Sequence, residues 1–407
     1  MASSVDPSTT AAKPLEAVAI IQSQVDALKE VYRGQFPVDS AVLKVLPQGT
    51  ESAECQRYGQ SGWSFTAKVM ALQNGTTVPY FLKYVPGELG RQQLLGEFTG
   101  MTELWKLSPE FVVKPVAWGK LADTSQDWYF LLMEFKNLST QLVDADKLAR
   151  RVVELHKRSQ ARSDTGGKFG FPIQTFDGAR LQAVGWDSSW ASFFSKLLAE
   201  AYRQETEANG VWPELEKAHQ QVQSDVIPRL LGVLEEDGRK VIPTLIHGDM
   251  WEGNVGTDSV TGEPWIFDCA VYYGHHEMEL GIWRADRHQF SHDNLYINEY
   301  RDNFDDDDSY VDEEFEDRIM LYSAKTNFMY STCFPRAQAR VHILNNFNYL
   351  LNKYAADIEK RKRLTTPAKS QKTEVACDGI AQSTWTEAPY DSKIQGIRMS
   401  ALVEARD

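Results

Sequence analysis

The stretch HGDMWEGN, residues 247–254, places Asp249 and Asn254 five positions apart in one polar segment. A second carboxylate, Asp268, follows fourteen residues after Asn254 within the apolar run 264–270, which predicts a strand. A carboxylate can orient a hydroxyl group and accept its proton, whereas an amide oxygen and another carboxylate can hold Mg²⁺. The alternative interpretation is a polar loop in which Asp268 is incidental. A set of fixed positions followed by an Asp at a workable distance is a specific signal, so this alternative is the weaker one.

An Asp, an Asn five residues later and a second Asp behind a strand resemble the layout by which protein-kinase-like enzymes build a phosphoryl-transfer site. In that layout the metal and its ligands neutralise negative charge that grows on the phosphates. The stretch therefore favours an enzyme that uses ATP and Mg²⁺.

Bulk properties narrow the class of protein. The chain has 407 residues, a hydrophobic content of 42% and a charged content of 25%, which are typical of a soluble globular protein with one large domain or two ordinary ones. A net charge of −14 argues against a general nucleic-acid binder. No apolar run reaches the length needed to cross a bilayer, so neither nucleic acid nor membrane is an expected partner.

The cysteines and the N-terminal residues bear on the compartment. Four cysteines are spread along the chain without any CxxC pair, at Cys55, Cys269, Cys333 and Cys377. This spacing favours neither a disulfide framework nor a zinc site, and it predicts a reducing, cytoplasmic location. Residues 1–14 are rich in Ser, Thr and Ala, lack the layout of a secretory signal and are predicted to be disordered.

Residues 15–136 predict a small nucleotide-binding lobe. Its expected elements are a helix at 15–32, strands at 51–58, 63–72 and 78–85, a helix at 90–108, and strands at 111–118 and 128–135. The Asn74-Gly75 pair between two β-prone runs is a strong hairpin signal. The order of elements predicts a five-stranded antiparallel sheet with one main helix, as in the small lobe of a kinase.

Residues 137–364 predict a larger, mainly helical lobe that carries the catalytic loop and the acceptor site. Helices are expected at 144–159, 188–207 and 213–236, before the motif, and again after it. The acidic run 305–308 lacks the spacing of an EF-hand and is predicted to be a solvated loop. Residues 365–407 form a polar tail, in which 394–403 could make a short helix. The fold class is therefore α+β, bilobal and protein-kinase-like.

Lys83 lies within the apolar strand YFLKYV, residues 80–85. A lone strand lysine usually points to solvent, but the helix that begins seven residues later contains Glu97. A strand lysine held by a helix glutamate is how kinases direct an ammonium group at the α- and β-phosphates. Position alone does not separate Glu97 from Glu103 or Glu88, although Glu97 fits best.

Other segments are candidates for nucleotide contacts. Met133, Glu134 and Phe135 end the fifth predicted strand, where the two lobes would join, and their backbone groups would hydrogen-bond adenine. The segment Gly59–Gly62 could cover phosphates, but an ordinary tight turn explains two glycines equally well.

Three further side chains complete the site. His247 is predicted to orient the loop, and His156, on an apolar helix face, to pack in the core. Trp251 lies between the expected base and the expected metal-binding Asn, where it could stack on a sugar-like acceptor.

At these residues the chain resembles the fructosamine-3-kinase (ketosamine-3-kinase) family, relatives of aminoglycoside and choline phosphotransferases. HGDMWEGN is similar to that family's HGDLWSGN, and the segment 267–280 is similar to its D-P-A and Y-G-H-x-E-x-E/D-L motifs. The segment 168–171 and the aromatic run 190–194 are similar to another family segment. The resemblance extends from about Ser52 to Tyr354.

The resemblance implies the following roles: Asp249 as the base, Asn254 and Asp268 as Mg²⁺ ligands, Lys83 with Glu97 as the phosphate clamp, and Trp251 and His275 near the acceptor sugar. The implied reaction moves the ATP γ-phosphate to the 3-hydroxyl of a ribulosamine or fructosamine. The acceptor would be a glycated amine or a glycated protein lysine, and decay of the unstable 3-phosphate would free the amine.

The chain departs from the family at three places. Cys269 replaces a Pro, the glycine-rich loop matches poorly, and residues 327–333 lack an Asn/His-rich pattern near the acceptor. One alternative is a kinase for another hydroxyl acceptor, such as an amino sugar or a choline-like base. Another is a pseudokinase that binds nucleotide without turnover, against which the full set of catalytic residue types argues. The sequence leaves the preferred sugar and the oligomeric state open.

Overall fold

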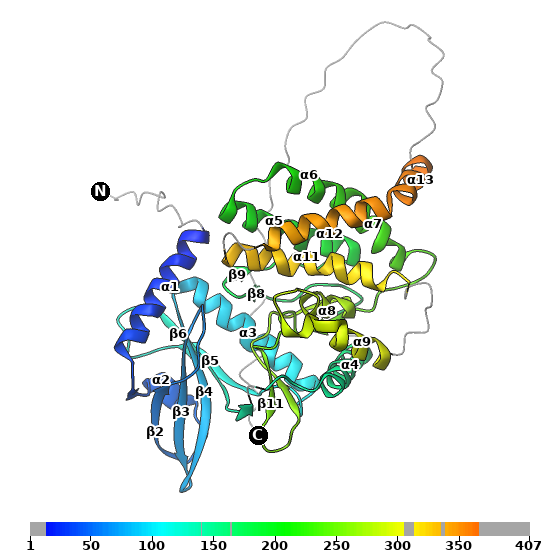
Figure 1. Ribbon diagram of the computed structural model, residues 1–407. Coiled ribbons are helices and arrows are strands. Elements are labelled where there is room, and N and C mark those ends of the chain that lie inside the picture. Colours follow the sequence, from blue (N-terminus) through cyan, green and yellow to red (C-terminus); the bar gives the residue numbers. More distant parts are fainter. Residues whose placement is uncertain (1–13, 140, 163–164, 305–312, 335–337, 366–407) are drawn as a thin grey trace, which may run out of the picture. The chain divides into compact units, whose positions relative to one another are not determined.

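The computed structural model of the chain describes residues 14–139, 141–162, 165–304, 313–334 and 338–365 (Figure 1). The chain divides into two units, Met1–Lys362 and Arg363–Asp407. The sheet, the cavity and every interaction described below belong to the first unit. The predicted disordered segment (apart from Pro14), the acidic run 305–308 and the polar tail from residue 366 onward lie outside the described residues. The predicted lobe boundary at residues 136 and 137 remains a prediction.

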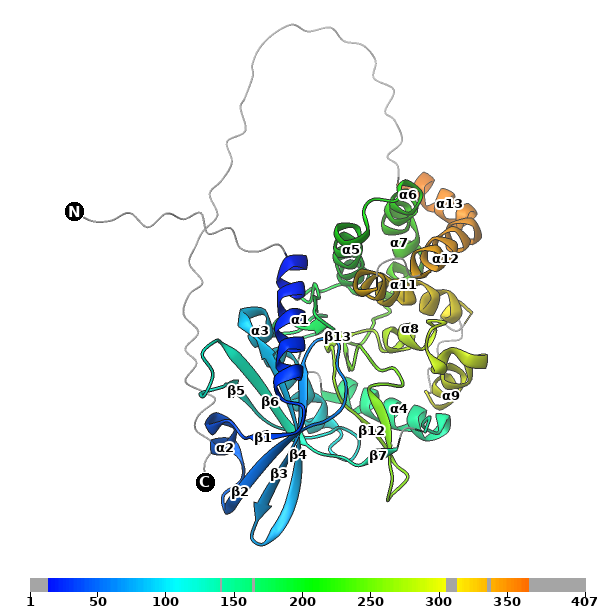
Figure 2. The ribbon, with the colours of Figure 1, turned by 60° about the vertical axis from the view of Figure 1, so that its left-hand side comes forward.

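One antiparallel sheet has six strands in the order β1-β2-β3-β4-β6-β5 (Figure 2). The strands are β1 Gln35–Pro37, β2 Thr50–Arg57, β3 Phe65–Gln73, β4 Thr76–Pro86, β5 Pro115–Lys120 and β6 Trp128–Glu134. Five strands were predicted, and the sixth is β1, which has only three residues and is too short to show an alternating pattern. The β3–β4 turn at Asn74-Gly75 is confirmed, and both residues have positive φ, as this turn signal requires.

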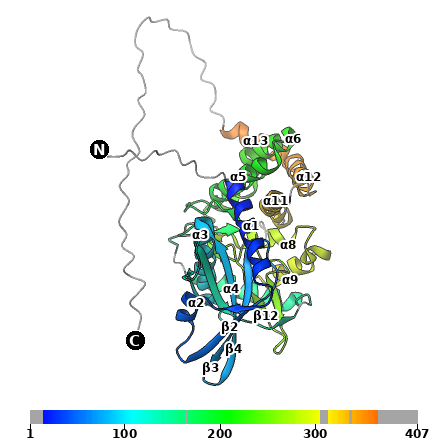
Figure 3. The same ribbon diagram turned by 90° about the vertical axis from the view of Figure 1, so that its left-hand side faces the viewer.

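Three helices of the described ranges pack against the sheet, as Figure 1 and Figure 3 show, and the short α2, Ser40–Val45, contacts β5. Helix α1, Pro14–Val31, contacts β3 and β4, whereas α3, Gly87–Leu107, contacts β4, β5 and β6. Leu94, Met101 and Leu104 of α3 are buried at helical spacing. Glu97 lies on the same face, three residues after Leu94, so its carboxylate is carried toward the sheet.

The remainder of the first unit is mainly helical and confirms the predicted α+β class. The helices are α4 Ala145–Arg162, α5 Trp190–Asn209, α6 Pro213–Gln221, α7 Ile227–Leu230, α8 Leu280–Trp283, α9 Leu295–Asn303, α11 Phe315–Cys333, α12 Ala339–Lys353 and α13 Ala355–Thr365. None of the helices in the described ranges combines the length and apolar character needed to span a lipid bilayer.

The structure corrects two predicted elements. The expected helix 213–236 is interrupted by a π-helical turn, Val222–Val226, and ends in a 3-10 turn, Gly232–Glu235. Pro228 has no N–H to donate to the preceding turn, which accounts for the wider winding there. The expected strand 264–270 is β12, only Pro264–Ile266, because Asp268 adopts a φ of 65° that no strand accommodates.

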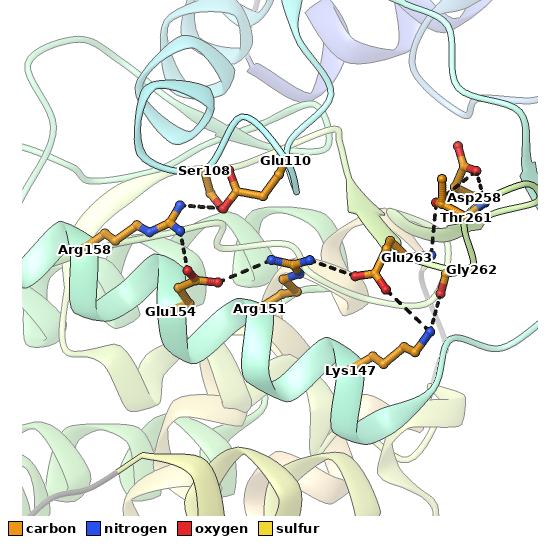
Figure 4. A network of polar contacts seen from close by, with 10 residues as sticks. All are labelled: Ser108, Glu110, Lys147, Arg151, Glu154, Arg158, Asp258, Thr261, Gly262 and Glu263. Carbon is orange, nitrogen blue, oxygen red and sulfur yellow. Dashed lines mark hydrogen bonds and ion pairs between the residues drawn. The ribbon is translucent and has the colours of Figure 1, made fainter.

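A chain of ion pairs on α4 connects segments that are distant in sequence (Figure 4). Arg158 binds Glu110, in the loop after α3, at 2.6 Å, and Arg151 binds Glu263, beside the turn after β11 (Val255–Asp258), at 2.8 Å. Glu154 contacts both arginines. Individual exposed pairs contribute about 0–1 kcal/mol each, so the main effect of this network is to fix the positions of the two segments on α4.

The buried His219 of α6 gives a test of how α6 packs against α5. Burial lowers the pKa of His219 to about 4, and its ring stacks on Tyr202 at 4.1 Å. The folded protein therefore binds fewer protons than the unfolded chain below pH 6.5, so stability falls as the pH decreases from 6.5 toward 4. We expect His219→Gln to remove about 2 kcal/mol of the difference between the unfolding free energies at pH 7 and pH 4.5, measured by denaturant unfolding. The exposed control His292→Gln should retain the wild-type slope, and an unchanged slope in His219→Gln would contradict a neutral, buried ring.

Candidate active site

A cavity of about 840 Å³ lies between the sheet and the loops that follow β10, Thr244–Ile246, and β12. Every predicted site residue except His275 lines it. The lining also includes the segment Gly59–Gly62, so this loop faces the same cavity as the predicted phosphate clamp. The structure thus brings together residues that are almost 200 positions apart in sequence.

Lys83 is at the centre of the cavity wall. Its Nζ donates to Oε1 of Glu97 at 2.7 Å and to Oδ1 of Asp268 at 2.6 Å. Lys83 is only 5% exposed, whereas the Asp268 side chain is 44% exposed. The ammonium group therefore links β4, α3 and the loop after β12.

The structure also distinguishes Glu97 from the two alternatives. Glu88 and Glu103 each form an ion pair with a basic residue three positions further along α3, away from the cavity. Burial raises the pKa of Glu97 to about 7, against the attraction of Lys83. Burial opposes the charge of Lys83, but the carboxylates of Asp268 and Glu97 override it and raise the lysine pKa, so this side chain remains an ammonium.

The loop that carries Asp249 is held by a buried carboxylate that was not predicted as a site residue. Glu279 accepts the backbone N–H of His247 at 2.6 Å and that of Gly248 at 3.0 Å. Gly248 has a φ of 78°, and a Cβ there would meet the carbonyl oxygen of Ala270 at 2.4 Å, so no other residue fits. Sequence reasoning could have found Glu279, because this residue belongs to the segment 267–280 that resembles a family motif.

His247 connects the two loops of the site. Its Nε2 lies 2.9 Å from the carbonyl oxygen of Phe267, and its Nδ1 accepts the backbone N–H of Asp249 at 3.3 Å. Burial lowers the pKa of His247, so the ring is neutral with its hydrogen on Nε2. This geometry fits the predicted orienting role.

Asn254 places an amide between the two aspartates. Its Nδ2 donates to Oδ2 of Asp249 at 2.8 Å and to the carbonyl oxygen of Asp268 at 3.2 Å. With the nitrogen engaged, the amide oxygen is the atom left for a cation. This oxygen and the exposed carboxylate of Asp268 are hard donors of the kind that Mg²⁺ prefers.

The described residues contain no group of three or more His, Cys, Asp or Glu side chains that could hold a metal ion. Magnesium is nevertheless commonly bound by one or two protein ligands together with substrate phosphates and water. The pair Asn254 and Asp268 is therefore sufficient for a metal that arrives with a nucleotide.

Asp249 is influenced by an ion pair that the sequence did not indicate. Lys325 of α11 binds Asp177 of β8, Phe176–Asp177, at 2.7 Å. Burial, followed by the charges of Asp177 and Asp268, raises the pKa of Asp249 well above its usual range, while Lys325 opposes the rise. β8 is a two-residue strand without a periodic pattern, so no sequence signal marked Asp177.

Aromatic rings form the wall near the end of β6. Tyr58 packs edge-on against Phe135 at 5.2 Å and against Phe81 at 6.4 Å, and all three residues line the cavity. The backbone N–H of Glu134 already donates to the carbonyl of Lys114 at 2.9 Å. A planar base could stack beside these rings, while hydrogen bonds from the backbone of residues 133–135 to adenine remain a prediction.

Trp251 also lines the cavity, with its ring 5.4 Å from that of His288. His275, in contrast, does not reach the cavity. Its Nδ1 lies 3.0 Å from the hydroxyl of Tyr322, and burial lowers its pKa well below the usual range. The predicted contact of His275 with substrate is therefore replaced by a packing role behind β13, Tyr272–Gly274.

Comparison with known proteins shows the family of the chain. A family model described as fructosamine kinase matches residues 50–345, well over half of the chain. The chloroplastic protein-ribulosamine 3-kinase of Oryza sativa subsp. japonica is 31% identical over 208 residues, covering 51% of this chain and 56% of that protein. The ketosamine-3-kinase of Mus musculus is 29% identical over 228 residues, covering 50% and 68%. The match thus spans little more than half of the rice relative.

Two solved structures share the fold. A putative fructosamine-3-kinase from Haemophilus somnus 129PT has a TM-score of 0.56 and 16% identity, covering 83% of this chain and 99% of that one. Another from Thermobifida fusca YX-ER1 has a TM-score of 0.57 and 19% identity, covering 77% and 99%. At these identities the likeness concerns the fold alone.

The role of Glu279 can be tested by Glu279→Gln. Burial alone would raise the pKa of Glu279, but the nearby His156 ring and the His247 backbone lower it, so the charged form is the one the fold favours. An amide has one acceptor oxygen fewer, so one backbone N–H of the loop loses its partner. We expect the free energy of unfolding to fall by about 1–3 kcal/mol.

The matched control is Glu316→Gln on α11, whose carboxylate pairs with Arg284 at the surface. This change should alter the unfolding free energy by no more than about 0.5 kcal/mol. Equal stability of the two variants would show that Glu279 does not support the loop.

Proposed function

Because the chain belongs to the fructosamine kinase family, we propose that it is a kinase that transfers the γ-phosphate of ATP to the 3-hydroxyl of a ketosamine. The acceptor is a ribulosamine or fructosamine adduct on an amine or a protein lysine. The observation that carries this proposal is the convergence of Lys83, Glu97 and Asp268 in the cavity that Asp249 and Asn254 also line.

Each residue has a role set by its position. Lys83, held by Glu97, directs its ammonium at the α- and β-phosphates. Asp249 accepts the proton of the attacking hydroxyl, and its raised pKa makes it a stronger base than an ordinary Asp. Its hydrogen bond from Asn254 fixes the carboxylate toward the cavity.

Asn254 and Asp268 would hold Mg²⁺ through the amide and carboxylate oxygens described above. Bound Mg²⁺ supplies positive charge that neutralises the phosphates during transfer. Lys83 already supports Asp268 at 2.6 Å, so the clamp and the metal ligand are oriented by one contact.

The acceptor would lie at the Trp251 end of the cavity, where an indole face can stack on a sugar. Phosphorylation at the 3-position makes the adduct unstable, so that the free amine is regenerated. On this proposal the partners are glycated amines or proteins, and a cytoplasmic location remains our prediction.

The experiment that tests the function measures ATP consumption with Mg²⁺ against ribulosyl- and fructosyl-amines, a glycated protein, an aminoglycoside and choline. Turnover of ketosamines alone supports the proposal. Turnover of only the aminoglycoside or choline would retain the kinase and change the acceptor class. ATP binding without turnover on any member would favour a pseudokinase.

We expect Asp249→Asn to lower kcat by at least about a hundredfold, since a positioned base contributes about 10²–10⁴ to the rate. The Kd for ATP with Mg²⁺ should remain within a few-fold of wild type, measured by calorimetry. Asp258→Asn, in the β11–β12 turn, serves as a control with normal turnover. Wild-type turnover by Asp249→Asn would remove this carboxylate from the mechanism.

Trp251→Ala should raise KM for the acceptor by more than it raises KM for ATP, because the indole lies at the acceptor end of the cavity. Initial-rate kinetics with each substrate varied in turn provide the measurement. A larger rise in the KM for ATP would instead place the nucleotide beside Trp251.

A further inference from the structure

The guanidinium group of Arg287 lines the acceptor end of the cavity, in the segment after α8. Its Nη1 donates to Oδ1 of Asn327 at 2.5 Å, and its Cζ lies 4.2 Å from the centre of the Tyr330 ring. These two contacts come from α11 and hold the guanidinium plane in one orientation. Arg287 is thus a fixed cation and not a flexible surface side chain.

One donor of this cation has no partner. The Nε–H of Arg287 is buried and donates to no hydrogen-bond acceptor among the described residues. Within the same ranges, Arg287 forms no ion pair with a carboxylate, and its side-chain hydrogen bond goes to the amide of Asn327. A buried N–H without an acceptor is unfavourable, and a guanidinium stays protonated at any physiological pH.

Nearby carboxylates in the cavity have other partners. Asp177 binds Lys325 at 2.7 Å, and Glu252 lies 3.3 Å from His288. The charges of Asp177, Asp249 and Glu252 act on Arg287, but none of these carboxylates forms an ion pair with it among the described residues. A ligand that brings its own oxyanion would supply the missing acceptor.

We propose, on the basis of the proposed function, that the acceptor ketosamine carries an oxyanion that binds Arg287. A planar guanidinium with parallel donors suits carboxylates and phosphates alike. The oxyanion is either the carboxylate of an amino acid whose α-amine is glycated or a phosphate on the sugar. A neutral amine adduct, or a protein lysine glycated at its ε-amine with no neighbouring oxyanion, would be a poorer acceptor.

The test compares three matched acceptors: fructosyl-glycine, fructosyl-glycinamide and the 6-phosphate of fructosyl-glycinamide. We expect wild-type kcat/KM for at least one anionic acceptor to exceed that for the neutral one by about ten- to a hundredfold, as for a charge-assisted hydrogen bond. A preference for fructosyl-glycine identifies a carboxylate, and a preference for the 6-phosphate identifies a phosphate. Equal kcat/KM for all three overturns the inference while leaving the kinase proposal intact.

Arg287→Met keeps the packing against Tyr330 and removes the charge. In this variant kcat/KM for the preferred anionic acceptor should fall by about ten- to a hundredfold more than kcat/KM for fructosyl-glycinamide, so the preference is lost. An equal loss on all three acceptors would show that Arg287 serves the transferred phosphate and would overturn the inference. Absence of turnover by the wild type on every ketosamine would instead reject the proposed function.

The matched control is Arg284→Met, three residues earlier. Arg284 pairs with Glu316 and does not line the cavity, so its removal should leave the preference among acceptors unchanged. Thermal unfolding of both variants shows whether they are folded. Loss of the preference in Arg284→Met as well would assign the effect to local structure and overturn the role of Arg287.

Discussion

The contact of one buried ammonium, Lys83, with two carboxylates is the constraint on which the site depends. An isolated charge in the interior is unfavourable, and here Glu97 and Asp268 compensate it at 2.7 and 2.6 Å. The contact is possible only if β4 turns Lys83 inward and α3 turns Glu97 toward the sheet. It also requires the chain after β12 to bend at Asp268, whose φ of 65° ends the strand.

A second buried carboxylate, Glu279, performs the corresponding task for the loop of Asp249. Its carboxylate accepts hydrogen bonds from two backbone N–H groups, which the sharp turn at Gly248 leaves without a partner on a neighbouring strand. His247 then joins this loop to the carbonyl before Asp268. Asp249 and Asp268 are thus held relative to each other by two buried side chains, Glu279 and His247, that bind the backbone of their loops.

Sequence reasoning placed the side chains of the site correctly where their position follows from local spacing. The strand around Lys83, the helical phase of Glu97 and the five-residue separation of Asp249 and Asn254 all follow from the geometry of single segments. It failed for His275, because a motif gives the order of residues but not the direction of each side chain. The 3-10 turn that begins at His276 buries this neighbourhood, and His275 faces Tyr322 instead of the cavity.

The cavity residues that the proposal assigns to the nucleotide and those that it assigns to the acceptor differ in how they are positioned. Recognisable motifs supply most of the first, whereas the second combines Trp251 of the loop, Arg287 after α8 and Tyr330 of α11. These three meet only through tertiary packing, and Arg287 is oriented by α11 through Asn327 and Tyr330. Since specificity depends on such contacts, the motif supports the proposed chemistry of transfer, while the acceptor must be inferred from the charges that the fold leaves facing the cavity.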